Sequence, residues 1–239
     1  MIKVVAAIRR RPGMAQAEYF DYIENVHGKL ARDNPLGLSR YVQNHVKDAA
    51  FGVTGDASHL TVLPRDSVTE LWFEDFPALG RTFADPYTQQ VLGPDGKNFS
   101  DLPTALSLLT SESGEWGNTA QGLKIMYFLK AAQSATPEVF AQEWTAADLR
   151  ARTSGAILGG IRSHAISPPP GAPQGGGDND YFGGKDMIAY DGIQSLYVAP
   201  ETAIQDFRAY EAIFTDGSAP WLDRSRSFWL LTKEVKIIG

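Results

Sequence analysis

One pattern of apolar and polar residues occurs twice in this chain, and the repeat limits the folds that the chain can adopt. "KVVAAIRR" leads through a helical segment to "RYVQNHV", and after residue 120 "KIMYFLKA" leads in the same way to "IRSHAI". The correspondence resumes in "RDSVTELWFED" with "YDGIQSLYVAP" and in "SLLTSE" with "WLLTKE". In this alignment Lys3 meets Lys124 and Leu71 meets Leu196, but His27 meets Asp148. Shared apolar positions indicate a shared fold, so we place any chemistry in the first copy, which has the histidine.

The periodicity of the first copy predicts the order of its elements. Residues 2–9 form a short apolar run typical of a buried strand. The period then changes to three and four residues over 15–32, which predicts a helix with Phe20, Ile23, His27 and Leu30 on one stripe. The other predicted elements are strands at 38–46, 67–75 and 105–111 and a second helix within 76–92, with a turn-rich segment at 93–101. The order strand, helix, strand, strand, helix, strand is that of a ferredoxin-like domain.

Such a domain has both helices on one face of its sheet, so the other sheet face needs a partner. The second copy can supply it. The predicted fold class is therefore α+β, with two tandem ferredoxin-like domains, 1–115 and 122–239, that pack sheet to sheet as a dimeric-type α/β barrel within one chain. Val5 and Leu71, or their strand neighbours, are then expected to lie between the copies. The linker is expected at 114–122.

The composition excludes several classes of protein. A net charge of −6 gives no basic footprint for nucleic acid. No apolar run is long enough to span a membrane and no signal-peptide pattern is present, so a cytoplasmic protein is expected. The absence of cysteine excludes disulfides, thiolate nucleophiles and cysteine-ligated metals. The four histidines lack the close helical spacing of a zinc site, and we expect neither a metal nor another cofactor.

His27 is the first candidate for chemistry, because its spacing puts it on the inner stripe of the first helix. A hydrogen-bonded core histidine is the alternative interpretation, but polar residues on the neighbouring strands favour a function. Histidine has an unperturbed pKa of ~6.5 and can act as a general acid or base beside a carboxylate. We therefore predict that His27 transfers a proton and that Glu70 and His45 orient or polarise.

Large and polar side chains near His27 are the candidates for substrate binding. Aromatic side chains can stack on a flat ligand, and Tyr and Trp can also form hydrogen bonds. The predicted binding residues are Phe20, Tyr41, Asn44, Trp72 and Phe83. The spacing does not tell which face of each strand meets the helices, so Asn44 and His45, which are adjacent, cannot both line the pocket.

The second copy has a different character. It is rich in aromatic residues, which we expect to fill its core. Asp148 is expected to be exposed or paired, with Arg150 or Arg152 as partners, because an unpaired buried carboxylate is costly. Residues 167–184 are rich in Pro and Gly and indicate a flexible loop, or a lid over a pocket.

Three segments together carry a resemblance to a known family. "YFDYIENVHGKLA", "LSRYVQNHV" and "DSVTELWFED" resemble the EthD family of the dimeric α/β-barrel superfamily. The second half resembles it mainly through "YDGIQSLYVAP" and departs at the histidine. The resemblance implies a pocket between the sheet and the first helix, with His27 as the polar catalytic group. Members that are understood include cofactor-free dehydratases and decarboxylases acting on aromatic or polyketide-derived compounds.

The leading hypothesis is a cofactor-independent lyase or isomerase-type enzyme, acting by dehydration, decarboxylation or related proton transfer on a hydrophobic, oxygenated, aromatic or polyketide-like small molecule. Two alternatives remain open: a cofactor-free monooxygenase, and a non-catalytic binder of small molecules. A haem protein would need an axial histidine facing a wide cavity, for which His164 is the candidate in the second half. Two chains could also form a homodimer.

Overall fold

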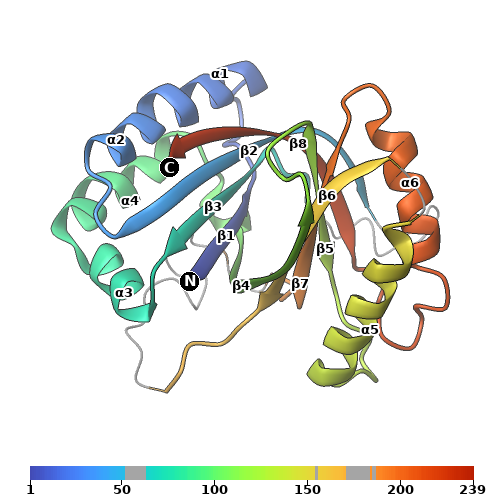
Figure 1. Cartoon of the computed structure of the whole chain (residues 1–239). Helices are drawn as coiled ribbons and strands as arrows, with labels where there is room; N and C mark the ends of the chain where they lie inside the picture. Colours follow the sequence, from blue (N-terminus) through green and yellow to red (C-terminus); the bar gives the residue numbers. More distant parts are fainter. Residues whose placement is uncertain (52–62, 154–155, 171–183, 185–186) are drawn as a thin grey trace.

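The structure is a computed structural model that describes residues 1–51, 63–153, 156–170, 184 and 187–239. Its strands close into a barrel with helices on two opposite sides (Figure 1). The strands are β1 (Ile2–Ile8), β2 (Leu38–Phe51), β3 (Ser67–Phe73), β4 (Leu106–Gly117), β5 (Leu123–Leu129), β6 (Ile157–Ala165), β7 (Gly192–Val198) and β8 (Phe228–Ile238).

The helices differ in type between the two halves. Those of the second half are the α-helices α5 (Pro137–Ala151) and α6 (Ala203–Phe214). Among the described residues, those of the first half are α1 (Gln16–Asp21), the π-helix η1 (Tyr22–His27), α2 (Gly28–Asp33), α3 (Phe76–Ala84), the π-helix η3 (Thr88–Leu92), α4 (Gly93–Asp95) and the 3₁₀ helices η4 (Gly96–Asn98) and η5 (Leu102–Thr104). The two π-helices of the described ranges therefore lie in the half that has the histidine.

The strand order confirms the predicted fold class. Around the barrel it is β1-β3-β2-β8-β5-β7-β6-β4, and every neighbouring pair is antiparallel. Each half has its strands in the ferredoxin-like order, with the fourth strand at one edge and the second at the other. The halves join where β2 pairs with β8 and where β6 pairs with β4. The barrel is thus closed within one chain.

The boundary between the halves differs from the expectation in one respect. The expected linker at 114–122 is partly wrong, because β4 continues to Gly117 and pairs there with β6 after a register shift. The remaining connection before β5 is short. The division into units 1–115 and 122–239 stays a proposal, supported by the strand order that repeats on each side of it. Most of the loop expected at 167–184 lies outside the described residues.

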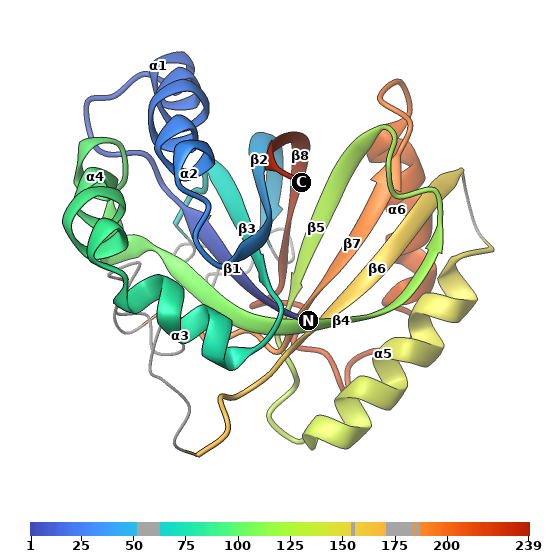
Figure 2. The ribbon, with the colours of Figure 1, turned by 60° about the vertical axis from the view of Figure 1, so that its left-hand side comes forward.

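The barrel separates three apolar layers. One lies inside the barrel and includes Val5 and Met126 from the two halves, as expected. The other two lie between the outer sheet faces and the helices, which cover the barrel on both sides (Figure 2). Leu71 belongs to the helix-side layer of the first half, so its placement between the copies was wrong, although its strand neighbour Glu70 does face the interior. The alternation of a strand gives two faces but does not label them.

A buried carboxylate joins the two halves inside the barrel. Glu70 is fully buried, with Lys3 Nζ 2.8 Å from its Oε1 and Lys124 Nζ 2.5 Å from its Oε2. Burial opposes ionisation, but the two lysines outweigh it and hold the pKa of Glu70 far below its usual range. The lysines also contact Glu112 and Glu234, which are partly exposed. Since Lys3 and Lys124 come from different halves, the carboxylate of Glu70 ties them together.

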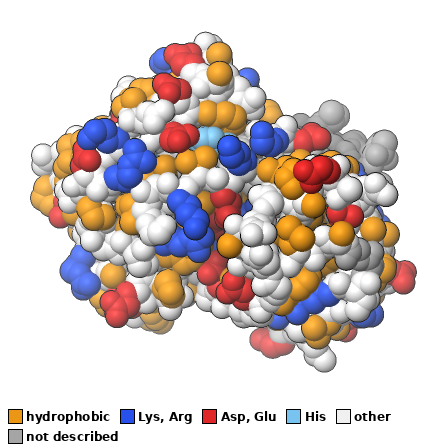
Figure 3. All heavy atoms as spheres, turned by 45° about the horizontal axis from the view of Figure 1, so that its top comes forward, with side chains coloured by type: hydrophobic (Ala, Val, Ile, Leu, Met, Phe, Trp, Pro, Cys, Tyr) orange, Lys and Arg blue, Asp and Glu red, His pale blue; other side chains and the backbone are white. Residues whose placement is uncertain are grey.

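Figure 3 shows the charged side chains on one face of the molecule. Basic and acidic side chains are interspersed there, and acidic side chains are visible in the hollow between the two lobes. No helix within the described ranges is long and apolar enough to cross a membrane.

Glu70→Gln should lower the free energy of unfolding by about 3 kcal/mol, because it removes the anion that two buried lysines share. Urea denaturation at neutral pH measures this loss. Glu74→Gln, on the exposed end of the same segment, is the control and should change stability by less than about 0.5 kcal/mol. Equal effects of the two substitutions would contradict the role given to Glu70.

Candidate active site

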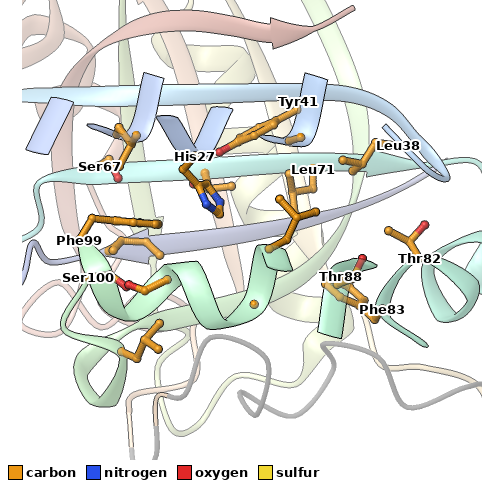
Figure 4. Close-up of a pocket in the computed structure, with 18 of the residues that line it drawn as sticks. His27, Leu38, Tyr41, Ser67, Leu71, Thr82, Phe83, Thr88, Phe99 and Ser100 are labelled. Carbon is orange, nitrogen blue, oxygen red and sulfur yellow. The ribbon is translucent and has the colours of Figure 1, made fainter. Parts of the chain in front are cut away.

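A cavity lies between the outer face of the first half's sheet and the helices that cover it (Figure 4). Its volume is about 70 Å³. Its walls are mainly apolar, with a few hydroxyl groups and one imidazole, and the lining residues include Tyr19, His27, Tyr41, Ser67, Leu71, Phe83, Thr88, Leu92, Phe99 and Ser100. Figure 4 shows His27, Ser67, Phe99 and Ser100 toward one end and Leu38, Thr82, Phe83 and Thr88 toward the other.

His27 reaches the cavity through the π-helix η1. His27 is the last residue of this helix. The N–H of the next residue, Gly28, donates to the carbonyl oxygen of Ile23, five residues earlier. Gln43 of β2 donates its Nε2 to the same carbonyl over 2.6 Å. A Cβ on Gly28 would lie 2.9 Å from Ile23 O and 3.1 Å from Ile237 Cδ1, so only glycine allows this approach. The "VHGKL" segment thus has a physical reason: the helix must lie close to the sheet at Gly28.

The π-helix also changes which residues face the sheet. The predicted inner stripe was Phe20, Ile23, His27 and Leu30. Of these four side chains only Ile23 is buried, and the other three are partly exposed. The fully buried residues are Tyr19, Ile23, Gly28 and Ala31, because the wider turn inserts one residue into the period. His27 lies at the flank of this stripe with 18% of its side chain exposed, at the border between cavity and solvent.

His27 has a carboxylate partner that the sequence did not indicate. Its Nδ1 lies 2.9 Å from Asp95 Oδ2. The other oxygen, Oδ1, accepts from Tyr22 OH over 2.7 Å and from Asn98 Nδ2 over 2.8 Å. Burial opposes ionisation of Asp95, but the hydrogen bonds from His27, Tyr22 and Asn98 outweigh it and lower its pKa to about 2. An ionised Asp95 accepts a hydrogen bond from Nδ1–H of His27. In the uncharged imidazole the lone pair that can take a proton is then on Nε2.

Asp95 lies in the segment at 93–101 that was predicted to be turns. That prediction was wrong for residues 93–98, which form α4 and η4. The glycines and proline of "GPDGKN" predict turns when read alone. The contact with His27 spans 68 positions in the sequence. The sequence signal for Asp95 was an acidic residue in a segment rich in Gly and Pro. Such residues are too common for this signal to identify the carboxylate that contacts His27.

Two of the predicted binding residues lie with His27, and five other predicted site residues do not, three of them because they face the barrel interior. Tyr41 and Phe83 line the cavity. Glu70, Trp72 and Asn44 face the barrel interior, on the opposite side of the sheet, where Asn44 Nδ2 donates to Glu70 Oε2 over 2.9 Å. Trp72 Nε1 donates to Glu112 Oε2 over 3.0 Å. The correction follows from the alternation of β2 and β3, which turns Thr69 and Leu71, rather than Glu70 and Trp72, toward the helices.

His45 and Phe20 form a separate pair. Both lie on the helix side of the sheet, but neither lines the cavity. Their rings stack with centroids 4.4 Å apart and an interplanar angle of 8°. Burial first, and then Lys233 and Lys47, lower the pKa of His45 to about 4. The structure therefore does not bring His45 to His27, and the imidazole of His45 is neutral at physiological pH.

The corresponding region of the second half is filled. Asp148, at the position of His27, is fully buried and accepts from Arg152, Arg162 and Tyr210. The expected pairing with Arg152 is thus present, and Arg162 and Tyr210 are further partners. Aromatic side chains occupy the layer around it, including Phe140, Trp144, Phe207 and Phe214. The second half thus has an ion-paired Asp148, bound by Arg152 and Arg162, at the position where the first half has His27.

The described residues contain no metal-ligand cluster, and His164 packs against an aromatic ring. No group of three His, Asp or Glu side chains in the described part of the chain could hold a metal ion. His164, the candidate for a haem ligand, is partly exposed, and its ring packs against Trp144 with centroids 4.4 Å apart.

Part of the chain matches a known family of proteins. Residues 11–103 match the sequence profile of the EthD domain, so the expected family is confirmed for that part of the chain. A curated relative, dehydratase ustZ from Ustilaginoidea virens, is 26% identical over 97 residues, which cover 38% of this chain and 69% of that protein.

Solved structures share the fold over nearly the whole chain. An anthrone oxidase-like protein superposes with a TM-score of 0.60 at 7% identity, covering 99% of this chain and 93% of its own. A putative monooxygenase from Fusobacterium nucleatum subsp. nucleatum ATCC 25586 superposes with a TM-score of 0.54 at 8% identity, covering 100% and 95%. At such identities the likeness shows the fold alone, that of the dimeric α/β barrels.

The buried imidazole of His45, which stacks on Phe20, predicts a loss of stability in acid. The pKa of His45 is lower in the folded protein than its ordinary 6.5, so the unfolded chain binds more protons between pH 6.5 and about 4. The stabilisation is therefore complete above pH 6.5 and lost as the pH falls toward 4, by roughly 2–3 kcal/mol in all. His45→Gln should flatten the dependence of Tm on pH in this range. A profile parallel to that of the wild type would refute the assignment.

Proposed function

We propose that this chain, whose residues 11–103 form an EthD domain, is a proton-transfer enzyme that removes water from a neutral, hydrophobic hydroxy-carbonyl compound. The observation that carries the proposal is the pair of His27 and Asp95 at the border of an apolar cavity. Asp95 orients the imidazole and stabilises its protonated form, as a carboxylate does in a hydrolase triad. The similarity of 97 residues of this chain to a protein named as a dehydratase supports the same reaction class.

The chemistry requires a single base that later acts as an acid. Nε2 of His27 takes a proton from the carbon next to the substrate carbonyl, and the electron pair of that C–H bond moves toward the carbonyl oxygen. The enolate then expels the hydroxyl on the adjacent carbon while the imidazolium returns the proton to it. The products are water and an unsaturated carbonyl compound, and His27 is neutral again. In this proposal Tyr41 donates a hydrogen bond to the carbonyl oxygen; its hydroxyl points toward the His27 end of the cavity in Figure 4, which supports this role.

The charge of the cavity favours dehydration over decarboxylation. Among the described residues that line it there is no Lys, Arg, Asp or Glu. A substrate carboxylate would enter this wall without a cationic partner other than a protonated His27, and burying an unpaired charge is costly. A neutral ketone with a hydroxyl group meets no such penalty. The substrate class is therefore oxygenated but uncharged.

The size of the cavity adds a condition. Its volume of about 70 Å³ is smaller than the ~150 Å³ cavity that accommodates benzene in another protein. An aromatic substrate must therefore displace wall side chains on entry.

A cofactor-free monooxygenase is the second candidate, because the same pair could deprotonate an aromatic ketone whose anion then reacts with oxygen. The structural relatives named as an anthrone oxidase-like protein and a monooxygenase motivate this alternative. Oxygen uptake separates the two reactions, since dehydration consumes none.

His27→Gln should lower the rate of dehydration roughly 10²- to 10⁴-fold, the usual contribution of a positioned acid–base group. The probe is 3-hydroxy-1-tetralone, which loses water to give the fluorescent product 1-naphthol. Asp95→Asn should also be slow, because it no longer holds the Nδ1 proton of His27. Leu149→Ala, on the exposed face of α5, is the control. A His27→Gln rate within threefold of the wild type would mean that His27 is not the base.

A further inference from the structure

We propose that Thr88 donates a hydrogen bond to a second oxygen of the substrate, at the end of the cavity remote from His27. The inference rests on the proposed function and extends it: the substrate is then an elongated neutral compound, oxygenated at both ends. Thr88 lines the cavity and is 2% exposed.

The hydroxyl of Thr88 is unusual because it has no hydrogen-bond partner among the described residues. A buried hydroxyl without a partner costs free energy, and such groups are rare in folded proteins. A polar ligand in the cavity would satisfy it. Among the hydroxyl groups of the wall, only that of Thr88 is both buried and without a partner in the described part of the chain. Ser67 pairs with Tyr19, Ser100 with Gly96 O, Thr82 with Ala78 O and Gly37 N, and Tyr41 with Gln43 Nε2.

The position of Thr88 points the same way. It is the first residue of the π-helix η3, and His27 is the last residue of the π-helix η1. π-Helices are rare, and where a single π-helical turn interrupts an α-helix it often lies at a functional site. The two π-helices therefore place their polar side chains at two places on the same cavity, and Figure 4 shows Thr88 beside Phe83, away from His27. A ligand that contacts both residues must extend along the cavity.

The interaction can be measured without knowing the natural substrate. The probes are acetophenone, which has a carbonyl oxygen, and ethylbenzene, which has a similar size but no oxygen. Binding is followed by NMR through the methyl resonances of Leu71 and Leu92, which line the cavity. The quantity to compare is the ratio of the Kd for ethylbenzene to the Kd for acetophenone. This ratio should be roughly three- to tenfold higher in the wild type than in Thr88→Val, as expected for one hydrogen bond. Thr88→Ser should keep the preference.

Thermal stability gives an independent readout. Thr88→Val should raise the Tm of the free protein, because it removes a buried hydroxyl that has no partner. Thr232→Val, in the second half, is the control: this buried hydroxyl donates to Lys124 O and does not line the cavity, so its loss should lower the Tm and leave the preference for the ketone in place. A side chain with a purely structural role would not combine higher stability with weaker ketone binding.

The outcomes separate this inference from the proposed function. If acetophenone perturbs the cavity resonances but Thr88→Val keeps the full preference, Thr88 does not bind the oxygen and the role of His27 still stands. If Thr88→Val lowers the Tm, the hydroxyl has a structural partner and the inference is wrong. If neither probe perturbs these resonances in the wild type, the cavity is not a ligand site, and both proposals fail.

Discussion

The carboxylate of Glu70 is the interaction on which the closed barrel depends, because it is the anion between two fully buried lysines from opposite halves. The alignment of Leu71 with Leu196 places Ser195 at the position equivalent to Glu70, so only one half supplies this charge. The lysines are present in both halves, but the residue that neutralises them in the centre is not. The interior has thus become asymmetric while the strand order has stayed the same.

The two outer faces diverged through coupled changes. In the first half, Gln43 holds the Ile23 carbonyl at the π-helix and His27 is left at the border of a cavity. The strand register places Arg162 of the second half at the position equivalent to Gln43. Arg162 contacts Asp148, which stands at the position of His27, so a charge on the helix is matched by a charge on the strand. The second half thus has an ion pair surrounded by aromatic side chains where the first half has His27 at the border of a cavity.

The sequence predicted the barrel because a fold of this kind depends on the spacing of apolar residues. That spacing could be recognised in both halves of the chain. It did not predict the site in the same way. Glu70 and Thr69 are neighbours on a strand that is covered on both faces, so no contrast of exposed and buried positions told which one meets the helices. The stripe on the first helix failed at Tyr19 and Gly28 because a π-helix has a different period. Asp95 depended on a long-range contact, which local periodicity does not contain.

The closure of the barrel by β4 and β8 within a single polypeptide has a consequence for how the protein behaves on dilution. A barrel assembled from two chains dissociates at low concentration, since its stability is linked to protomer concentration. Here the partner sheet is covalently attached through a short connection, so its effective concentration is constant. The seams also leave each half without a free sheet edge, and free edges are where strands of other molecules add. The cavity of the first half therefore keeps its supporting sheet at cellular abundances where a two-chain barrel would come apart.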